Sequence, residues 1–169
     1  RDSATAQPEE CRVGFFCEGS TITPIPCPVG RYGTTGGLHH SWQCEECIPG
    51  HYCSGLGVSA IQECNPGRFG DTKGLGSAMC SGACQPGHYC PRGSTSRFQM
   101  RCPNGTFNSV AGGPSVEACQ NCTNSDCGSN LYQRGECTIT SNGFTCHVCD
   151  NLLCPQDKVR VGYCSGRIN

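Results

Sequence analysis

Residues 47–53 read CIPGHYC, and the same pattern returns as CQPGHYC at 84–90 and as CRVGFFC at 11–17. Each of these segments opens a group of four cysteines, and only two or three residues separate one group from the next. A pattern that keeps its register over successive groups indicates a tandem repeat. The four complete groups are Cys11, Cys17, Cys27 and Cys44; Cys47, Cys53, Cys64 and Cys80; Cys84, Cys90, Cys102 and Cys119; and Cys122, Cys127, Cys137 and Cys146.

The spacing within the groups divides the chain into modules. The first three groups have gaps of five, then nine to eleven, then fifteen or sixteen residues, whereas the fourth has gaps of four, nine and eight. The fourth group therefore forms a shorter subtype. We expect a polar lead-in at 1–10, modules at 11–44, 47–80 and 84–119, a shorter module at 122–146 and a truncated one at 149–169.

The last module contains three of its four cysteines, namely Cys149, Cys154 and Cys164. Aligned on the fourth group, the missing cysteine would lie nine residues past Cys164, beyond Asn169. We therefore expect the chain to be a piece of a longer protein. In the alternative interpretation, the odd cysteine bonds to another molecule.

The composition predicts a small disulfide-rich fold. Of 169 residues, 19 are cysteine and 35 are glycine or proline, while large apolar side chains are few: one Trp, two Met, five Tyr and six Phe. Such a chain cannot build one sizeable apolar core, but a bridge that closes a loop of about 15 residues stabilises the fold by roughly 3 kcal/mol. We expect an elongated tandem array of modules with short β-strands and turns and little helix.

A glycine followed two residues later by Phe or Tyr occurs twice in each of the first three modules. Glycine at this place suits a tight turn with a positive φ angle. The aromatic residue would supply the one sizeable apolar contact of each half-module, packed against a disulfide. The six aromatic residues are Phe16, Tyr32, Tyr52, Phe69, Tyr89 and Phe107.

The spacing alone permits three pairings of four cysteines. We favour a crossed pairing, first with third and second with fourth, because it clamps each module internally. The rival pairing joins Cys27 to Cys44, Cys64 to Cys80 and Cys102 to Cys119, and it needs other partners for Cys11 and Cys17. The favoured pairs are Cys11–Cys27, Cys17–Cys44, Cys47–Cys64, Cys53–Cys80, Cys84–Cys102, Cys90–Cys119, Cys122–Cys137, Cys127–Cys146 and Cys149–Cys164, which leave Cys154 unpaired or paired outside the chain.

The strings CPVGRYGTTGG, CEECIPGHYC and CQPGHYCPRGS resemble the ephrin-receptor-like cysteine-rich repeat, over about Cys11 to Cys119. The crossed clamp is similar to one module type of the tumour-necrosis-factor receptors. The tail, with its SNGFTC segment, resembles four-cysteine repeats in surface proteins of protists and algae. The resemblance implies elongated, disulfide-bonded extracellular rods in receptors, adhesion proteins and surface or flagellar filaments, and no enzymatic activity.

Zinc is the main alternative use for the cysteines. Three pairs have the two-residue spacing of a zinc knuckle, at Cys44–Cys47, Cys119–Cys122 and Cys146–Cys149. These pairs recur at uneven intervals, however, and lie at the junctions between modules. We therefore expect no metal site and no cofactor.

The other polar residues do not form a recognisable catalytic motif. His51 and His88 occupy a place that Phe15 takes in the first module, which favours packing over catalysis. His39 and His40 lie in a glycine-rich loop and are interpreted as solvated residues. The acidic pairs 9–10 and 45–46 are interpreted as solvated surface, since calcium would need six or more oxygens in a defined loop. We expect no small-molecule substrate.

Oxidised cysteines place the protein in an oxidising compartment, secreted or on the outer face of the cell surface. The sequons at Asn104 and Asn121 agree with a secretory route and are possible N-glycosylation sites. No apolar run is long enough to span a membrane, and a net charge of −1 with no basic patch gives no reason to expect nucleic-acid binding.

These observations predict a non-enzymatic extracellular segment of a larger surface or filament protein, with a structural or adhesive role. Its partners would be proteins, including copies of itself. The alternative is the ectodomain of a cell-surface receptor, in which an exposed loop such as Leu38 to Trp42 recognises a protein ligand.

Overall fold

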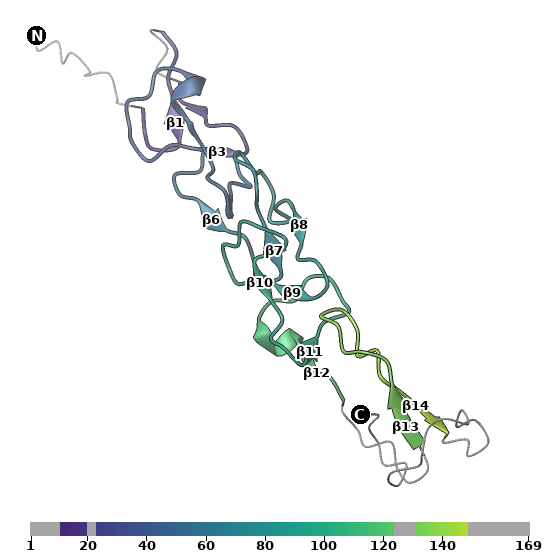
Figure 1. Ribbon diagram of the computed structural model, residues 1–169. Helices are drawn as coiled ribbons and strands as arrows, with labels where there is room; N and C mark the ends of the chain where they lie inside the picture. Colours follow the sequence, from purple (N-terminus) through teal and green to yellow (C-terminus); the bar gives the residue numbers. More distant parts are fainter. Residues whose placement is uncertain (1–10, 20–22, 124–130, 149–169) are drawn as a thin grey trace, which may run out of the picture.

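The computed structural model describes residues 11–19, 23–123 and 131–148. Within these ranges the chain forms an elongated rod in which short β-hairpins follow one another along a single axis (Figure 1). Seven two-stranded antiparallel sheets are present, and helical structure in these ranges is confined to two 3-10 turns, η1 (Ser41–Gln43) and η2 (Val116–Ala118). The expected disulfide-rich array of short strands and turns is confirmed. No helix in the described ranges is long and apolar enough to cross a membrane.

The structural repeat is a single hairpin, half the length of the expected four-cysteine module. We name the repeats hairpin units 1 to 6; they begin at Cys11, Cys27, Cys47, Cys64, Cys84 and Cys102. In each unit the first strand follows a turn, and the second strand ends next to the first cysteine of the following unit. The strand pairs are β1 (Phe15–Phe16) with β2 (Ile25–Pro26), β3 (Arg31–Tyr32) with β4 (Glu45–Glu46), β5 (His51–Tyr52) with β6 (Gln62–Glu63), β7 (Arg68–Phe69) with β8 (Gly82–Ala83), β9 (His88–Tyr89) with β10 (Met100–Arg101), and β11 (Thr106–Phe107) with β12 (Gln120–Asn121).

A longer hairpin follows unit 6. It pairs β13 (Leu131–Arg134) with β14 (Thr145–Val148) and lies at the end of the rod opposite β1 (Figure 1). Its strands have four residues each, whereas those of the six units have two. The shorter cysteine spacing predicted a separate subtype in this region, but not these longer strands.

Each unit begins with a tight turn of the form Cys-x-x-Gly. In unit 1 the Phe15 N–H donates to the Arg12 carbonyl at 3.1 Å, and the same bond recurs in the other five units. The glycine of this turn, here called the turn glycine, has φ between +79° and +86° in all six units. Left-handed backbone of this kind is strained for any residue with a Cβ. The predicted positive-φ turn is therefore confirmed.

The disulfides contradict the crossed pairing. In the described residues they run Cys11–Cys17, Cys27–Cys44, Cys47–Cys53, Cys64–Cys80, Cys84–Cys90, Cys102–Cys119 and Cys122–Cys137. Six predicted pairs are wrong: Cys11–Cys27, Cys17–Cys44, Cys47–Cys64, Cys53–Cys80, Cys84–Cys102 and Cys90–Cys119. The predicted Cys122–Cys137 bridge is confirmed. Cys146 is also disulfide-bonded, but Cys127, Cys149, Cys154 and Cys164 lie outside the described residues, so the remaining pairs stay predictions.

The hairpin explains why the crossed pairing fails. A disulfide needs Cα atoms within about 7 Å of each other. In units 1, 3 and 5 the turn and first strand bring two cysteines that are six positions apart to Cα distances of 5.9–6.2 Å. In units 2, 4 and 6 the returning strand brings the first cysteine to within 5.7–6.1 Å of one that lies 16 or 17 positions later. Each of these six bridges therefore closes within one unit, and none joins two units.

Sulfur takes the place of an apolar core. In the described part of the chain, the largest fully buried side chains are all cysteines: Cys27, Cys44, Cys47, Cys53, Cys64, Cys84 and Cys90. Phe16 of unit 1 is buried with the Cys27–Cys44 bridge of unit 2 and with Leu38. Phe69 of unit 4 is buried with Cys84 and Cys90 of unit 5. The predicted packing of aromatic residues against disulfides is confirmed at these two positions, and in both the bridge belongs to the next unit.

Backbone hydrogen bonds join each unit to the next, and the same three bonds recur at all five junctions. First, the turn glycine N–H donates to the carbonyl that follows the first strand of the next unit, as from Gly50 to Gly70 at 2.7 Å. Second, the N–H of the residue after the first strand donates to the next unit's loop, as from Cys53 to Leu75 at 2.9 Å. Third, a loop glycine of the next unit donates back to the first cysteine's carbonyl, as from Gly74 to Cys47 at 2.8 Å. We call this residue the loop glycine.

The turn glycines also contact the unit two positions further along. A Cβ added to Gly14, Gly30, Gly50 or Gly67 would overlap the carbonyl oxygen of Gly57, Gly74, Gly93 or Gly112, respectively. At these four positions glycine is required for two reasons: the backbone is left-handed, and a side chain would collide with the unit two positions along. Gly105 of unit 6 differs, because an added Cβ would meet no atom within 4 Å.

Gly67→Ala and Gly105→Ala form a matched pair that separates these two requirements. Both place alanine in a left-handed turn, at a cost of about 1–2 kcal/mol. Gly67→Ala also forces a methyl group into the Gly112 carbonyl, so we expect it to destabilise the chain by about 1–3 kcal/mol more. Thermal denaturation of the two oxidised variants measures the difference. Equal losses of stability would contradict the contact between units.

Peptide mapping of the non-reduced protein tests the sequential bridges. We expect linked peptides that contain Cys27 with Cys44, Cys64 with Cys80 and Cys102 with Cys119, each separable from the short loops Cys11–Cys17, Cys47–Cys53 and Cys84–Cys90. A peptide that joins Cys17 to Cys44 would restore the crossed pairing.

Candidate functional site

The cysteines that have the spacing of zinc knuckles are engaged in bridges. Cys44 and Cys47 belong to different disulfides, as do Cys119 and Cys122, and Cys146 is disulfide-bonded. Zinc binds the thiolate form, which a disulfide removes. Over the described ranges, no group of three or more His, Cys, Asp or Glu side chains is arranged to hold a metal ion.

The two histidines of the GHYC segments lie half-buried in equivalent places. The Nδ1 atom of His51 lies 3.2 Å from the Pro49 carbonyl, and that of His88 lies 3.2 Å from the Pro86 carbonyl. His88 also meets the ring of Phe98 edge-on, with centroids 5.2 Å apart. Both histidines therefore contact the turn, and His88 also packs against an aromatic ring.

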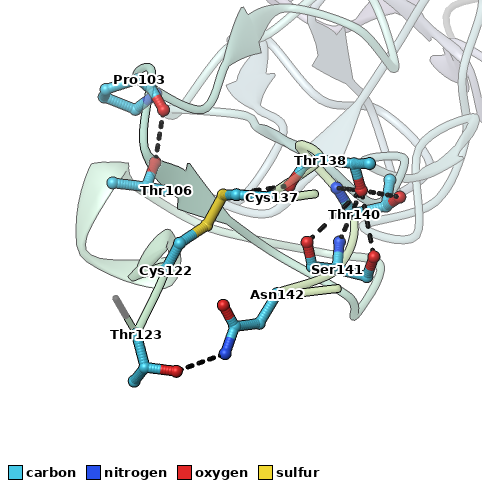
Figure 2. The surroundings of a disulfide bond; sticks show 9 residues. All are labelled: Pro103, Thr106, Cys122, Thr123, Cys137, Thr138, Thr140, Ser141 and Asn142. Carbon is cyan, nitrogen blue, oxygen red and sulfur yellow. Dashed lines mark hydrogen bonds between the residues drawn. A yellow bond between two sulfur atoms is a disulfide. The ribbon is translucent and has the colours of Figure 1, made fainter. Parts of the chain in front are cut away.

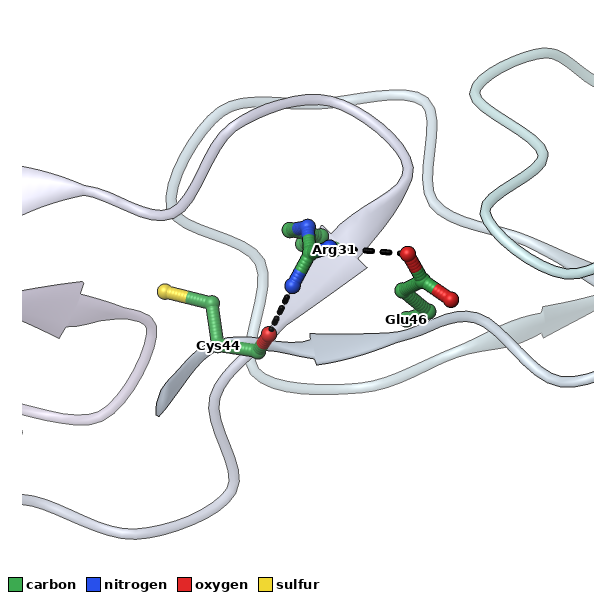
Figure 3. A network of polar contacts seen from close by, with 3 residues as sticks. All are labelled: Arg31, Cys44 and Glu46. Atoms are coloured by element: carbon green, nitrogen blue, oxygen red, sulfur yellow. Dashed lines mark hydrogen bonds and ion pairs between the residues drawn. The ribbon is translucent and has the colours of Figure 1, made fainter. Parts of the chain in front are cut away.

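The acidic pair in β4 is bound by its own hairpin. The strand register sets Arg31 opposite Glu46 and Tyr32 opposite Glu45. The Arg31 guanidinium donates to the Glu46 carboxylate and to the Cys44 carbonyl, each at 2.8 Å (Figure 3). Exposed ion pairs stabilise little on their own. Here the second bond fastens the end of the loop to β3, and Arg68 repeats it in unit 4 with the Met79 carbonyl at 3.0 Å.

Tyr32 completes this contact. Its hydroxyl donates to the Glu45 carboxylate at 3.0 Å, and this hydrogen bond, with a smaller effect of burial, raises the pKa of Tyr32 above its ordinary value. The bond contributes below the ordinary tyrosine pKa and is lost as the pH rises through the raised value. The Glu45 and Glu46 carboxylates are thus used within the hairpin, and the pair is not simply the solvated surface that the sequence suggested.

Among the residues that the structure describes, the most exposed large apolar side chain is Trp42, at 73 % of its full accessibility. It lies on η1, with its ring stacked on that of His40 at a centroid distance of 5.7 Å and an interplanar angle of 15°. The Gln43 side-chain oxygen accepts hydrogen bonds from the His39 and His40 N–H groups at 2.6 and 2.9 Å. We call residues 39–43 the Trp42 loop.

Both ends of the Trp42 loop are anchored. Leu38, on one side, is 8 % exposed and packs with Phe16, and Cys44, on the other, is bridged to Cys27. Aromatic side chains held in a fixed position are frequent centres of protein recognition. The expected recognition loop of Leu38 to Trp42 is therefore wrong at Leu38, which is buried, whereas His39, His40 and Trp42 are exposed.

The two sequons lie on the hairpin of unit 6. Asn104 is exposed in the turn, where Thr106 donates its hydroxyl to the Pro103 carbonyl at 2.8 Å. Asn121 is exposed in β12, directly opposite Thr106 in the strand register. Its sequon includes Cys122, which is bridged to Cys137.

Comparison with protein-family models and with characterised proteins finds no match to this sequence.

Sequence reasoning missed the residues that connect and brace the units. The loop glycines Gly37, Gly57, Gly74, Gly93 and Gly112 all have positive φ and recur once per unit, which is a signal that a half-module alignment would have found. The support of the Trp42 loop by Gln43 has no comparable sequence signal. It depends on the conformation of the loop in unit 2, and in unit 4 the residue that corresponds to Gln43 is Met79.

Gln43→Ala tests whether the Trp42 loop is held in a fixed conformation. Without the amide, the His39 and His40 N–H groups lose their acceptor, so we expect the Trp42 side chain to move more freely. Trp42 is the sole tryptophan, so a fall in its fluorescence anisotropy measures the change directly. Gln62→Ala, on exposed β6, is the matched control, and equal anisotropy in both variants would contradict this role of Gln43.

Proposed function

We propose that this chain is a non-enzymatic extracellular structural or adhesive segment of a larger surface or filament protein, a spacer stiffened by disulfides. The observation that carries the proposal is the junction of three backbone hydrogen bonds repeated at five successive interfaces. Hydrogen bonds between repeats hold each unit on its neighbour, and bridges inside each unit stop it from unravelling. The result is a fixed length and direction, which a spacer needs.

The burial of sulfur supports the extracellular part of this proposal. Because cysteine supplies the largest fully buried side chains, the fold depends on oxidation. Disulfides persist in oxidising compartments and are rare where glutathione keeps thiols reduced. These features suit a rigid disulfide-rich unit on the outside of a cell.

The ephrin-receptor-like strings fall within hairpin units 1 to 6, and we propose kinship with that class of repeat. The crossed clamp that suggested the tumour-necrosis-factor receptors is replaced by bridges within single hairpins, so that part of the resemblance loses its basis.

Single-molecule stretching of the chain between its two ends tests the spacer function. More than half of the residues between Cys11 and Cys122 lie inside bridged loops. We expect discrete unfolding steps when the protein is oxidised, and a contour-length gain that more than doubles after reduction, because the loops then extend as well. A chain that extends smoothly at low force, or whose gain is unaffected by reductant, would contradict a mechanical role.

The exposure and support of the Trp42 loop favour one alternative, a receptor ectodomain that binds a protein. Trp42→Ala separates the two functions, because Trp42 makes no described contact with another unit and its removal leaves the junctions intact. Loss of binding to a soluble protein partner with unchanged stretching behaviour would favour the receptor.

A further inference from the structure

The first end of the array carries an unfilled junction. In each later unit, the carbonyl after the first strand and the loop glycine N–H bond to the preceding unit. In unit 1 the same places are taken by the Cys17 carbonyl and the Gly19 N–H, and Gly19 has the loop glycine's positive φ, +62°. Among the described residues, neither group has a hydrogen-bond partner. We call these two groups the leading face.

The last unit carries the opposite half of the same junction. In units 1 to 5, the turn glycine N–H and the first cysteine's carbonyl bond to the following unit. In unit 6 these groups are the Gly105 N–H and the Cys102 carbonyl, and within the described ranges neither has a partner. The space beside Gly105 is open, whereas the other five turn glycines are covered. We call these two groups the trailing face.

The two faces are complementary. By the pattern of the five internal junctions, the Gly105 N–H of one chain would donate to the Cys17 carbonyl of another, and the second chain's Gly19 N–H would donate to the first chain's Cys102 carbonyl. The contact is heterologous, so repetition produces an open fibre instead of a closed dimer. A second copy is the occupant that this geometry specifies, because it alone presents the leading face in the register that the five internal junctions share.

The trailing face is partly covered by the segment after unit 6. In units 1 to 5 the residue after the first strand donates its N–H to the loop of the next unit. The corresponding residue of unit 6, Asn108, donates instead to the Ile139 carbonyl at 2.9 Å. The Ile139 side chain covers Gly87, where a carbon added to the glycine would lie 2.8 Å from Cγ1. Ile139 therefore occupies the place that the loop of a seventh unit would fill.

The covering segment is braced so that it does not complete the junction. We call residues 137–142 the cap. The Cys122–Cys137 bridge ties the cap to the chain beside the Pro103–Thr106 turn (Figure 2). The Thr138 N–H donates to the Ser141 carbonyl at 3.0 Å, so it does not reach the Cys102 carbonyl as a loop glycine would. The Thr138 hydroxyl accepts from the Ser141 N–H at 3.1 Å and closes the loop on itself.

We infer that the leading and trailing faces are interaction surfaces through which copies of this chain join end to end, and that the cap blocks this contact until it is displaced. The inference rests on the proposed structural function, which requires a stiff array to extend. A neighbour's loop cannot enter while Ile139 holds the Asn108 N–H, since both need the same donor.

Cys122→Ser with Cys137→Ser releases the cap in the full chain. With free thiols alkylated, we expect the weight-average mass of this variant to rise at least roughly twofold in sedimentation as its concentration is raised. The native chain should keep a constant mass over the same range. Where loss of the bridge also unfolds unit 6, Ile139→Asp carries the test, because it keeps the bridge but sets a charge against Gly87.

Gly105→Asn in the released variant tests the register. Asparagine tolerates left-handed backbone, and the side chain meets open space in a single chain. In an assembled chain its Cβ would overlap the neighbour's unit 2, as a Cβ on Gly67 would overlap Gly112. We expect association to be lost with Gly105→Asn and kept with Val110→Ser, an exposed change in the same unit.

Two results would overturn the inference: a released variant of constant mass, or an association that Gly105→Asn leaves unchanged. A chain that is stiff under force but never associates would leave the spacer function standing. A chain without mechanical resistance would remove the spacer function whether or not copies associate.

Discussion

The array depends on the close approach of one turn to the backbone of another. In units 1 to 4 the turn glycine has a left-handed conformation, donates its N–H to the next unit and lies against the loop glycine of the unit after that. A side chain at this position would disturb all three at once. A rod with few apolar residues can be held by such contacts because backbone groups approach closely enough to bond directly, and each hydrogen bond contributes about 1 kcal/mol net.

Bridges and hydrogen bonds have separate tasks in this fold. The six bridges of units 1 to 6 each close within one hairpin and restrict the unfolded chain. They cannot by themselves hold neighbouring units in line, because none crosses a junction. The alignment comes from the three bonds between neighbours, supplemented where an aromatic residue such as Phe16 packs on the next bridge. We therefore expect the stiffness of the oxidised rod to depend both on the disulfides within units and on the hydrogen bonds between them.

The sequence was sufficient to predict the fold class, the turn glycines and, at Phe16 and Phe69, the packing of aromatic residues on sulfur, because these follow from local chemistry that recurs in the chain. It was misleading for the bridges. Grouping the cysteines in fours hid the hairpin as the true repeat, although the glycine and the aromatic residue recur in each half-module. The support of Trp42 by Gln43 and of Cys44 by Arg31 depends on loop paths that spacing does not encode.

A repeat joined by asymmetric junctions has two different ends. Each unit gives two N–H groups and one carbonyl to the next unit and receives the complement from the unit before, so an unmodified array would present matching groups at its two ends. Exposed, unpaired backbone edges of this kind favour uncontrolled association, and natural proteins cover them. By our proposal, residues 137–142 meet this requirement at the end of unit 6. Ile139 replaces the loop of a next unit in two contacts, the hydrogen bond from Asn108 and the packing against Gly87. The Thr138 N–H, which would bond to the Cys102 carbonyl in a continued array, bonds instead to the Ser141 carbonyl.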